Sequence, residues 1–401
     1  MNDMPVHRRN FLKQSSLAAA GTLLMPRFLH ALGGQQPGPQ RKIVVVIQLS
    51  GGNDGLNTII PIRNDIYYKM RPKLAIGGTE ALRLTDEAGL HPQLGYFKEL
   101  YDAGELALLN NVGYPNPDRS HFRSMDIWHT ASDSAAYLHT GWLGRYLDAQ
   151  CKGCDLPTQA IELDELLSLA LKGETNNGIA TTDPRRLYAT GSQPHLKAIA
   201  EAHHHHHEPE VDYLYKTLGT TLQSAEYIFK ESRRRPSKST YPNTELAKSL
   251  QTIASLAMSD INTTVYYVSL GSFDTHISQS AQQARLFEQL NGAVKAFVAD
   301  IKAGGRFNDL LLFTFSEFGR RVNQNASGGT DHGTANNMFF IGGGLKKQGF
   351  INALPDLTQT TANDLRYTVD FRQVYHMVLQ NWLEADATAI LGGRFAHPGI
   401  V

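Results

Sequence analysis

Acidic residues and histidines follow two apolar stretches in the C-terminal half of this 401-residue chain. Residues 309–315 form a nearly continuous apolar run, and Glu317 comes just after it. Asp274 and His276 follow a second apolar run, residues 264–270, in the same way. Both runs have the length and composition of strands buried on both faces of a parallel sheet. Open parallel sheets bind ligands at the carboxyl ends of their strands, so the pattern predicts a metal site there.

The polar residues that the pattern leaves at predicted strand ends include carboxylates, imidazoles and one serine. They are Asp54, Ser120, Asp274, His276, Glu317, Asp331 and His332. Two carboxylates about 4 Å apart repel by about 4 kcal/mol at an effective dielectric constant near 20, so a crevice holding several must bind cations or keep some protons. Oxygen and imidazole ligands together fit a divalent metal, Zn, Mn, Mg or Ca, and histidine favours the transition metals. The alternative is that these residues are scattered helix caps and surface ion pairs.

The elements that position these residues are predicted from the apolar pattern. Strands are expected at residues 42–49, 106–111, 264–270, 309–315 and 337–341, and helices at residues 91–104, 121–131, 245–260 and 287–301. The strand–helix–strand order of the last part predicts a parallel sheet with right-handed crossovers. The first strand opens into a glycine-rich turn at residues 50–55, which is no phosphate-binding P-loop because the Lys-Ser/Thr pair is missing. The fold class is therefore α/β, with a mostly parallel central sheet flanked by helices.

Ser120 is the last residue of a turn-rich loop, residues 113–120, and directly precedes the helix predicted at residues 121–131. One interpretation is a helix N-cap serine, which contributes about 1 kcal/mol of stability. The other is a nucleophile at a helix N-terminus, where the helix dipole and free N–H groups favour an anion. The spacing leaves both open.

The N-terminus predicts export. Arg8 and Arg9, followed by Phe-Leu-Lys and a small-residue apolar stretch at residues 17–25, are typical of a twin-arginine signal. The stretch is too short to span a bilayer, and Ala31 is the nearest candidate cleavage site. We expect a signal and linker in residues 1–40, partnership with the twin-arginine export machinery, and a periplasmic or extracellular protein that leaves the cell folded. A basic N-terminus that arose by chance is the alternative.

Composition also bears on nucleic-acid binding, membrane attachment and the roles of the cysteines and the histidine run. Lys plus Arg and Asp plus Glu both number 38, so net charge favours neither nucleic acid nor an anionic membrane. No later stretch is apolar and long enough to be a membrane anchor in the mature form. Cys151 and Cys154 indicate a local disulfide, with a redox role as the alternative. The histidine run at residues 203–207 indicates a solvated linker or a metal-binding tract. Residues 41–401 are expected to form one domain, interrupted by an irregular insertion at about 151–240.

Five motifs resemble one family. They are residues 49–58 (LSGGNDGLNT), 113–124 (GYPNPDRSHFRS), 273–276 (FDTH), 314–320 (TFSEFGR) and 331–334 (DHGT). These motifs are similar to those of the exported bacterial family catalogued as domain of unknown function 1501, which is grouped with the alkaline phosphatase and sulfatase superfamily. The resemblance covers nearly the whole mature chain and implies an alkaline-phosphatase-like, three-layer fold.

The resemblance also implies roles for single residues. Asp54 resembles the metal carboxylate after the first strand, Ser120 the nucleophile, and Asp274, His276 and His332 the ligands of one metal. Glu317 and Asp331 stand in the same motifs as candidate ligands. Phe318 follows Glu317 where the superfamily has a histidine, and Asp274 and His276 are closer than usual, which puts a second metal in doubt.

The implied chemistry is hydrolysis of a phosphate or sulfate ester, on a small molecule or a glycan. The metal would lower the pKa of Ser120 and stabilise developing charge. Arg119, Arg123 or Arg320 would clamp the anionic group, although each arginine more often serves a surface ion pair. The alternative is a non-catalytic, metal-stabilised binding or assembly protein with the same fold.

Overall fold

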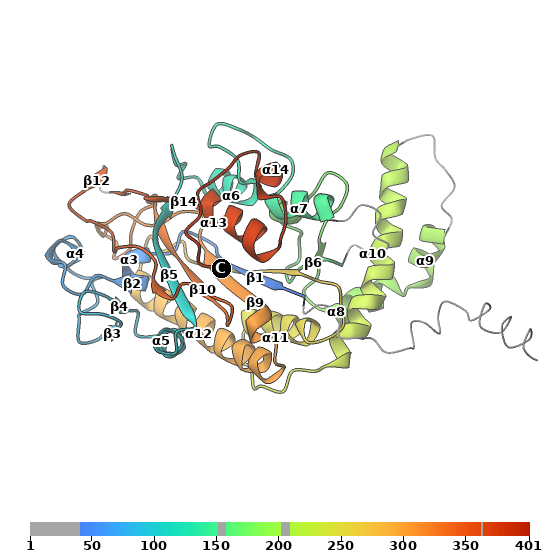
Figure 1. Cartoon of the computed structure of the whole chain (residues 1–401), viewed down its shortest axis with the longest axis horizontal. Helices are drawn as coiled ribbons and strands as arrows, with labels where there is room; N and C mark the ends of the chain where they lie inside the picture. The colour runs from blue at the N-terminus through green and yellow to red at the C-terminus, as the bar shows by residue number, and fades with distance from the viewer. Residues whose placement is uncertain (1–40, 151–157, 202–208, 362–363) are drawn as a thin grey trace, which may run out of the picture. The chain divides into compact units, whose positions relative to one another are not determined.

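A nine-stranded sheet runs through the centre of the computed structural model, which describes residues 41–150, 158–201, 209–361 and 364–401 (Figure 1). The strand order is β11-β5-β10-β9-β1-β8-β6-β7, with β14 paired to β5. The strands are β1 (Ile43–Leu49), β5 (Leu106–Gly113), β6 (Ala160–Glu162), β7 (Ile179–Ala180), β8 (Val265–Leu270), β9 (Leu310–Phe315), β10 (Asn336–Ile341), β11 (Gly349–Phe350) and β14 (Val369–Asp370). All five strands that the apolar pattern predicts are present.

The direction of these strands brings the polar motifs to one edge. Strands β9, β1, β8, β6 and β7 are parallel, and β10 runs antiparallel to both β9 and β5. Strand β5 therefore runs in the same direction as β9. The carboxyl ends of β5, β9, β1 and β8 consequently share one edge, and β10 begins at that edge. The predicted, mostly parallel sheet is confirmed. Strand β10 is antiparallel to its neighbours, and its sequence does not indicate that direction.

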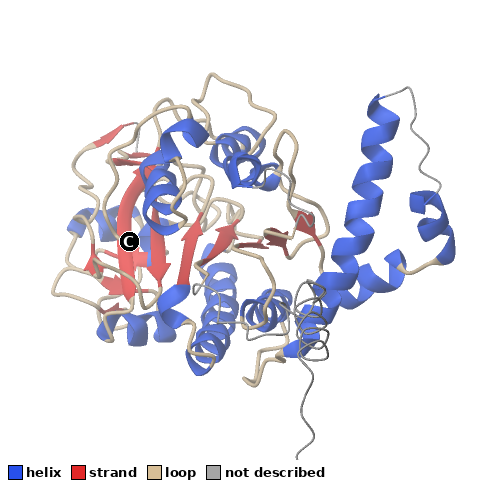
Figure 2. Ribbon diagram, turned by 45° about the vertical axis from the view of Figure 1, so that its right-hand side comes forward, coloured by secondary structure: helices blue, strands red, loops and turns tan. Residues whose placement is uncertain are grey.

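Helices cover both faces of the sheet (Figure 2). The side chains of β1 alternate between the two resulting cores: Val45 and Ile47 belong to one, and Val44 and Val46 to the other. The first core includes α5 (Gly95–Asp102), α11 (Glu245–Ala257) and α12 (Gln279–Ala303). The second includes α6 (His121–Thr130), α7 (Trp142–Gln150), α13 (Phe371–Met377) and α14 (Ala387–Leu391). A strand buried on both faces has a continuous apolar sequence, which is why the apolar runs predicted a central sheet flanked by helices.

Smaller elements lie outside the main layers. Helices α3 (Gly55–Thr58) and α4 (Asp65–Met70) follow β1, and β2 (Ile59–Ile60), β3 (Leu82–Arg83) and β4 (Gly89–Leu90) form a second sheet. Strands β12 (Thr360–Thr361) and β13 (Asp364–Leu365) pair with each other. Helix α13 continues into a π-helical turn, Val378–Trp382, and single 3-10 turns form at Leu169–Leu171 and Phe307–Asp309. Residues Lys42–Val401 form one compact unit.

The segment expected to be irregular is largely ordered where the structure describes it. Besides β6 and β7 it contains α8 (Pro184–Gly191), α9 (Pro194–Glu201) and the 26-residue α10 (Pro209–Arg234). Leu218, Leu222, Ala225 and Phe229 recur at helical spacing, a signal that predicts this helix when the segment is considered alone.

Three sequence predictions fall on residues outside the described ones. They concern Arg8 and Arg9 of the signal, Cys151 and Cys154, and the histidine run at residues 203–207. Among the described helices, none combines the length and apolar character that crossing a membrane requires.

Candidate metal centre

Four strands of the sheet, β5, β8, β9 and β10, deliver the candidate ligands to one edge of the sheet. Asp274 and His276 follow β8, Glu317 follows β9, and His121 is the first residue of α6, the helix after β5. His332 comes four residues before β10, where it forms a β-bridge with Arg320. Because β10 is antiparallel, its start meets the carboxyl ends of the other strands. Residues 211 positions apart along the chain, from His121 to His332, therefore come into contact.

Three imidazole nitrogens converge on one carboxylate oxygen. Oδ1 of Asp274 lies 3.0 Å from Nε2 of His276, 3.1 Å from Nε2 of His332 and 3.5 Å from Nε2 of His121. The Nε2 atoms of His276 and His332 are themselves 2.9 Å apart. Within the described residues, His121, Asp274 and His332 each offer a ligand atom within 4.8 Å of the other two. Of the predicted ligands, the structure thus brings Asp274, His276 and His332 together and adds His121.

The second ring nitrogen of each imidazole faces an oxygen. Nδ1 of His332 lies 2.8 Å from the carbonyl oxygen of Arg119, and Nδ1 of His121 lies 2.9 Å from Oε1 of Glu317. A carbonyl oxygen only accepts, so Nδ1 of His332 must carry the proton and a neutral ring presents a bare Nε2. Histidines that bind metals usually donate their other N–H to a carboxylate or carbonyl in this way.

His276 also has an oxygen near its Nδ1, but at a longer distance than in the other two histidines. Nδ1 of His276 lies 3.5 Å from Oδ1 of Asp331, a half-exposed carboxylate that also accepts from Asn325. Glu317, in contrast, is fully buried and accepts a second hydrogen bond from the backbone N–H of Gly51. Glu317 and Asp331 therefore lie behind the imidazoles and orient them, and a direct metal bond from either stays a prediction.

The donor set fits a divalent cation. Nε2 of His121 is buried and has no hydrogen-bond partner, although a carboxylate oxygen faces it at 3.5 Å. Neutral imidazoles place lone pairs opposite the lone pairs of Asp274, an arrangement that protons or a cation must resolve. Imidazole nitrogens with one carboxylate oxygen are ordinary ligands for zinc and other transition metals.

Electrostatics of the residues agrees with this interpretation. The hydrogen bond that His121 donates to Glu317 raises the pKa of His121 above its ordinary value, whereas burial lowers the pKa of His332. Burial opposes ionisation of Asp274, yet the hydrogen bond and the positive charge of Arg320 are the main effects that outweigh it, and the pKa of Asp274 is held at about 2. Asp274 is thus ionised at any physiological pH and attracts a cation.

Arg320 positions the loops beneath the centre. Its buried guanidinium donates to the carbonyl oxygens of Gly51, Gly52 and Thr330 and, at 2.8 Å, to Oδ1 of Asp274. Gly51 has φ +117°, and a Cβ there would lie 2.4 Å from the backbone nitrogen of Asp274, so only glycine permits this approach. All three guanidinium nitrogens of Arg320 donate to the protein, and one of them holds Asp274 in place. The predicted role of Arg320 as an anion clamp stays a prediction.

Phe318, where the superfamily resemblance would require a histidine, forms part of the floor of the centre. Its ring centroid lies 4.8 Å from that of His121 and 4.6 Å from that of His332. The aromatic ring therefore supports two imidazoles by packing and offers no ligand atom.

Asp54 lies apart from the histidines, in a second and fully buried cluster. Its carboxylate pairs with the guanidinium of Arg71 and accepts from Gln279 and from the backbone N–H of Leu56. Arg71 is itself buried and donates further to the carbonyl oxygens of residues 321 and 322. The positive charge beside Asp54 thus comes from the chain, and the predicted metal role of Asp54 stays a prediction.

The other predicted catalytic residues surround the helix start. Ser120 occupies the N-cap position of α6, but its side chain makes no capping hydrogen bond. The guanidinium of Arg119 pairs with Asp364, and that of Arg123 donates to the carbonyl oxygen of Ser134 and lies 3.9 Å from the ring centroid of Tyr137. The hydroxyl of Ser120 is therefore free of the structural role that was the alternative to a nucleophile.

Two residues of these clusters were missed by sequence reasoning. His121 directly follows Ser120 in the motif GYPNPDRSHFRS, so a histidine next to a candidate nucleophile was an available signal. Arg71 gave no signal, because it follows α4 in a segment without any motif and reaches Asp54 only through the tertiary fold.

Comparison with known proteins identifies the family. The family described as "Protein of unknown function (DUF1501)" matches residues 41–382. This match confirms the resemblance that the five motifs carry. No curated protein matches the chain by sequence.

Solved structures with a similar fold come from several bacteria. The C-terminal periplasmic domain of EcEptC from Escherichia coli is 10% identical, with 76% of this chain and 74% of that chain covered and a TM-score of 0.36. A protein of the alkaline phosphatase superfamily from Vibrio parahaemolyticus is 12% identical, with 90% and 68% covered and a TM-score of 0.35. Alkaline phosphatase from the Antarctic bacterium TAB5 is 9% identical, with 77% and 94% covered and a TM-score of 0.35.

Proposed function

This chain belongs to the DUF1501 family of proteins of unknown function, and we propose that it is a metal-dependent hydrolase of phosphate or sulfate esters. The observation that carries the proposal is the convergence of three Nε2 atoms on Oδ1 of Asp274. Each of the three rings has its Nδ1 turned to an oxygen behind it. Without a cation or added protons this arrangement is electrostatically unfavourable, because the lone pairs of the imidazoles face those of a carboxylate.

The proposed ligands are His121, Asp274 and His332, with His276 beside them. A divalent cation held there would supply Lewis-acid stabilisation of negative charge on the oxygens of the ester. Glu317 orients His121 by accepting from its Nδ1, and the Arg119 carbonyl does the same for His332.

Ser120 is the proposed nucleophile. Its hydroxyl would lose its proton and attack the phosphorus or sulfur atom, and the bond to the leaving alcohol would break. Water would then cleave the new ester bond and restore the hydroxyl. Three observations support this role: the absence of a capping hydrogen bond, the exposure of Ser120, and its place at the N-terminus of the ten-residue α6.

We also propose that the protein is exported. The twin-arginine pattern at Arg8 and Arg9 supports this compartment, and the folded protein would carry its metal across the membrane by that route. A metal inserted before export avoids competition among metals outside the cell.

A second candidate function is a non-catalytic, metal-stabilised binding protein with the same fold. The observation that favours it is the Arg71–Asp54 ion pair, which supplies a fixed positive charge within the chain. One bound cation at Asp274 would then hold the loops together without catalysis.

Metal analysis and an ester screen separate the two candidates. Protein matured in its own host should contain a divalent metal and should hydrolyse at least one phosphate monoester, phosphate diester or sulfate ester. Ser120→Ala should retain the metal and lose hydrolysis, whereas Ser280→Ala, which alters an exposed serine of α12, should change neither. Metal bound without turnover on any ester favours the binding protein, and a metal-free protein refutes both.

A further inference from the structure

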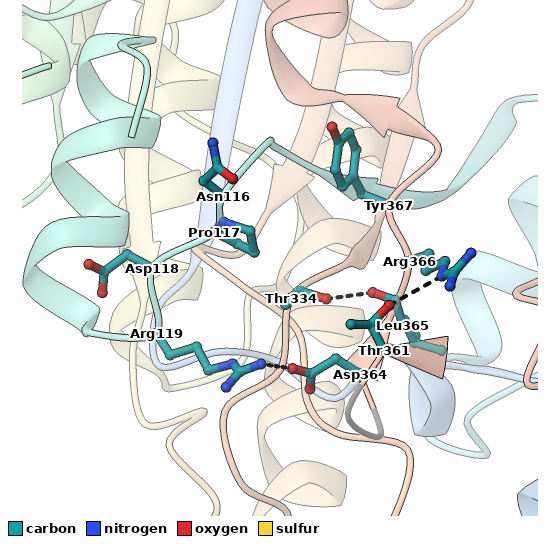
Figure 3. Close-up of a pocket in the computed structure, with 10 residues that line it drawn as sticks. All are labelled: Asn116, Pro117, Asp118, Arg119, Thr334, Thr361, Asp364, Leu365, Arg366 and Tyr367. Carbon is teal, nitrogen blue, oxygen red and sulfur yellow. Dashed lines mark hydrogen bonds and ion pairs between the residues drawn. The ribbon is translucent and has the colours of Figure 1, made fainter. Parts of the chain in front are cut away.

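A cavity of about 850 Å³ opens next to the metal centre (Figure 3). Its walls come from the loop before α6 and from residues around β13. The residues that matter for its chemistry are Asn116, Asp118, Arg119, Asp364, Arg366 and Tyr367. The volume lies within the range of about 300–1,000 Å³ that small-molecule sites occupy.

Arg119 belongs to both the centre and the cavity. Its carbonyl oxygen accepts from Nδ1 of His332, while its guanidinium pairs with Asp364 in the cavity wall. Thr334, two residues after His332, also lines the cavity. A molecule whose anionic group lies at the centre therefore has its remaining part directed toward this cavity.

The lining combines apolar surface with charged side chains of both signs and is close to neutral. The guanidinium groups of Arg119 and Arg366 are matched by the carboxylates of Asp118 and Asp364. Oδ1 of Asp364 is buried and has no hydrogen-bond partner, and burial raises the pKa of this residue. Nε of Arg366 donates to the hydroxyl of Thr361, and no described residue accepts from its terminal nitrogens. Such a wall offers both donors and acceptors and favours no net charge.

One aromatic ring completes the cavity. Tyr367 is 37% exposed, and Figure 3 shows its ring at the end of the cavity that also holds the Asn116 amide, away from the Arg119–Asp364 pair. A tyrosine ring provides a flat apolar face with a polar tip. The C–H face of a saturated six-membered ring packs on such a surface, while its hydroxyls need the surrounding donors and acceptors.

We propose that this cavity binds the leaving alcohol of the ester and that this alcohol is a hydroxyl-rich ring, a sugar or a cyclitol. The inference rests on the proposed hydrolase function, whose substrate class it narrows. A long alkyl chain does not suit these walls, because it would cover the guanidinium of Arg366 without offering it a hydrogen bond.

Equilibrium binding to the Ser120→Ala variant, which is expected to keep the metal and lose hydrolysis, tests the proposal without turnover; cleavage is then assayed with the unsubstituted protein. Calorimetric titrations would compare glucose 6-phosphate, N-acetylglucosamine 6-phosphate, glucose 6-sulfate and myo-inositol 1-phosphate with ethyl phosphate and ethyl sulfate. At least one cyclic ester should bind about tenfold more tightly than its ethyl counterpart, which corresponds to about 1.4 kcal/mol. The Tyr367→Ala/Arg366→Ala double variant should lose that advantage.

The control is Leu166→Ala, which alters another exposed apolar side chain outside the cavity and should keep the advantage. The proposal is overturned when no cyclic ester exceeds its ethyl counterpart, or when the advantage survives in the double variant. Failure of the hydrolase function has a different signature: the binding advantage is present, but none of the bound esters is cleaved.

Discussion

Asp54 and Asp274 are two carboxylates that follow parallel neighbouring strands, yet the chain treats them in opposite ways. Asp54 is 1% exposed and is surrounded by donors: the guanidinium of Arg71, the amide of Gln279 and a backbone N–H. The side chain of Asp274 is 46% exposed and faces three imidazole nitrogens, besides its hydrogen bond from Arg320.

The positive charge beside Asp54 is a fixed part of the chain, whereas the positive charge beside Asp274 can be a proton or a metal ion from solution. A guanidinium is a permanent cation, so the Arg71–Asp54 pair needs no metal ion from solution to balance the carboxylate. Imidazoles change protonation near neutral pH and bind metals when neutral, so the Asp274 cluster responds to its surroundings. We therefore expect the Asp54 cluster to determine whether the protein folds, and the Asp274 cluster to determine what it binds.

Breaking the structural pair should give the largest effect. Arg71→Met leaves the carboxylate of Asp54 buried without its cation, and we expect a loss of about 3–5 kcal/mol in the free energy of unfolding. Urea denaturation measures it. The Asp54→Asn/Arg71→Met double variant should recover much of the loss, because no unpaired charge remains. A loss below about 1 kcal/mol in Arg71→Met would contradict the structural role, because that is the range of exposed ion pairs.

Weakening the support of one imidazole should have a smaller effect, on metal affinity. Glu317→Gln keeps an oxygen for the N–H of Gly51 but removes the carboxylate behind His121, and we expect metal affinity to fall about 10- to 100-fold. Competition with a fluorescent chelator measures the affinity for Zn²⁺ and Mn²⁺. Asp331→Asn is the matched control and should lower affinity less, since Asp331 is half exposed and 3.5 Å from His276. Equal effects of the two variants would contradict the orienting role of Glu317.

Proton competition should give the smallest effect. The hydrogen bond that His121 donates to Glu317 raises the pKa of His121 above 6.5 in the metal-free protein. The protonated ring therefore contributes stability that is present below pH 6.5 and is lost as pH rises through the raised pKa. Metal affinity should change in the opposite direction and decline as pH falls below that pKa. NMR titration of the imidazole measures the pKa, which should be lower in Glu317→Gln. A pKa of His121 below 6.5 in the unsubstituted protein would contradict this expectation.

The two clusters also differ in how well the sequence alone predicted them. The runs at β1, β8 and β9 are almost entirely apolar because these strands are buried on both faces, and local composition reflects that burial. Their carboxyl ends then located Asp274, His276 and Glu317 at one edge of the sheet. The family motifs pointed to the same residues.

Long-range pairing is what local patterns do not record. Arg71 meets Asp54 because the segment after α4 folds back against α3, and Gln279 reaches the same carboxylate from the first turn of α12. Neither contact has a fixed spacing that a sequence pattern reveals. The antiparallel direction of β10 escaped prediction for the same reason, although it is what brings His332 to the carboxyl ends of its neighbours.

Direct titration of the metal-free protein with Zn²⁺ or Mn²⁺ tests the central claim, that Asp274 and its imidazoles form a cation site and Asp54 does not. The account predicts that binding is lost in Asp274→Ala, with circular dichroism unchanged. It also predicts that binding persists in the Asp54→Asn/Arg71→Met variant. Binding that survives in Asp274→Ala, or that disappears only when Asp54 is replaced, would contradict it.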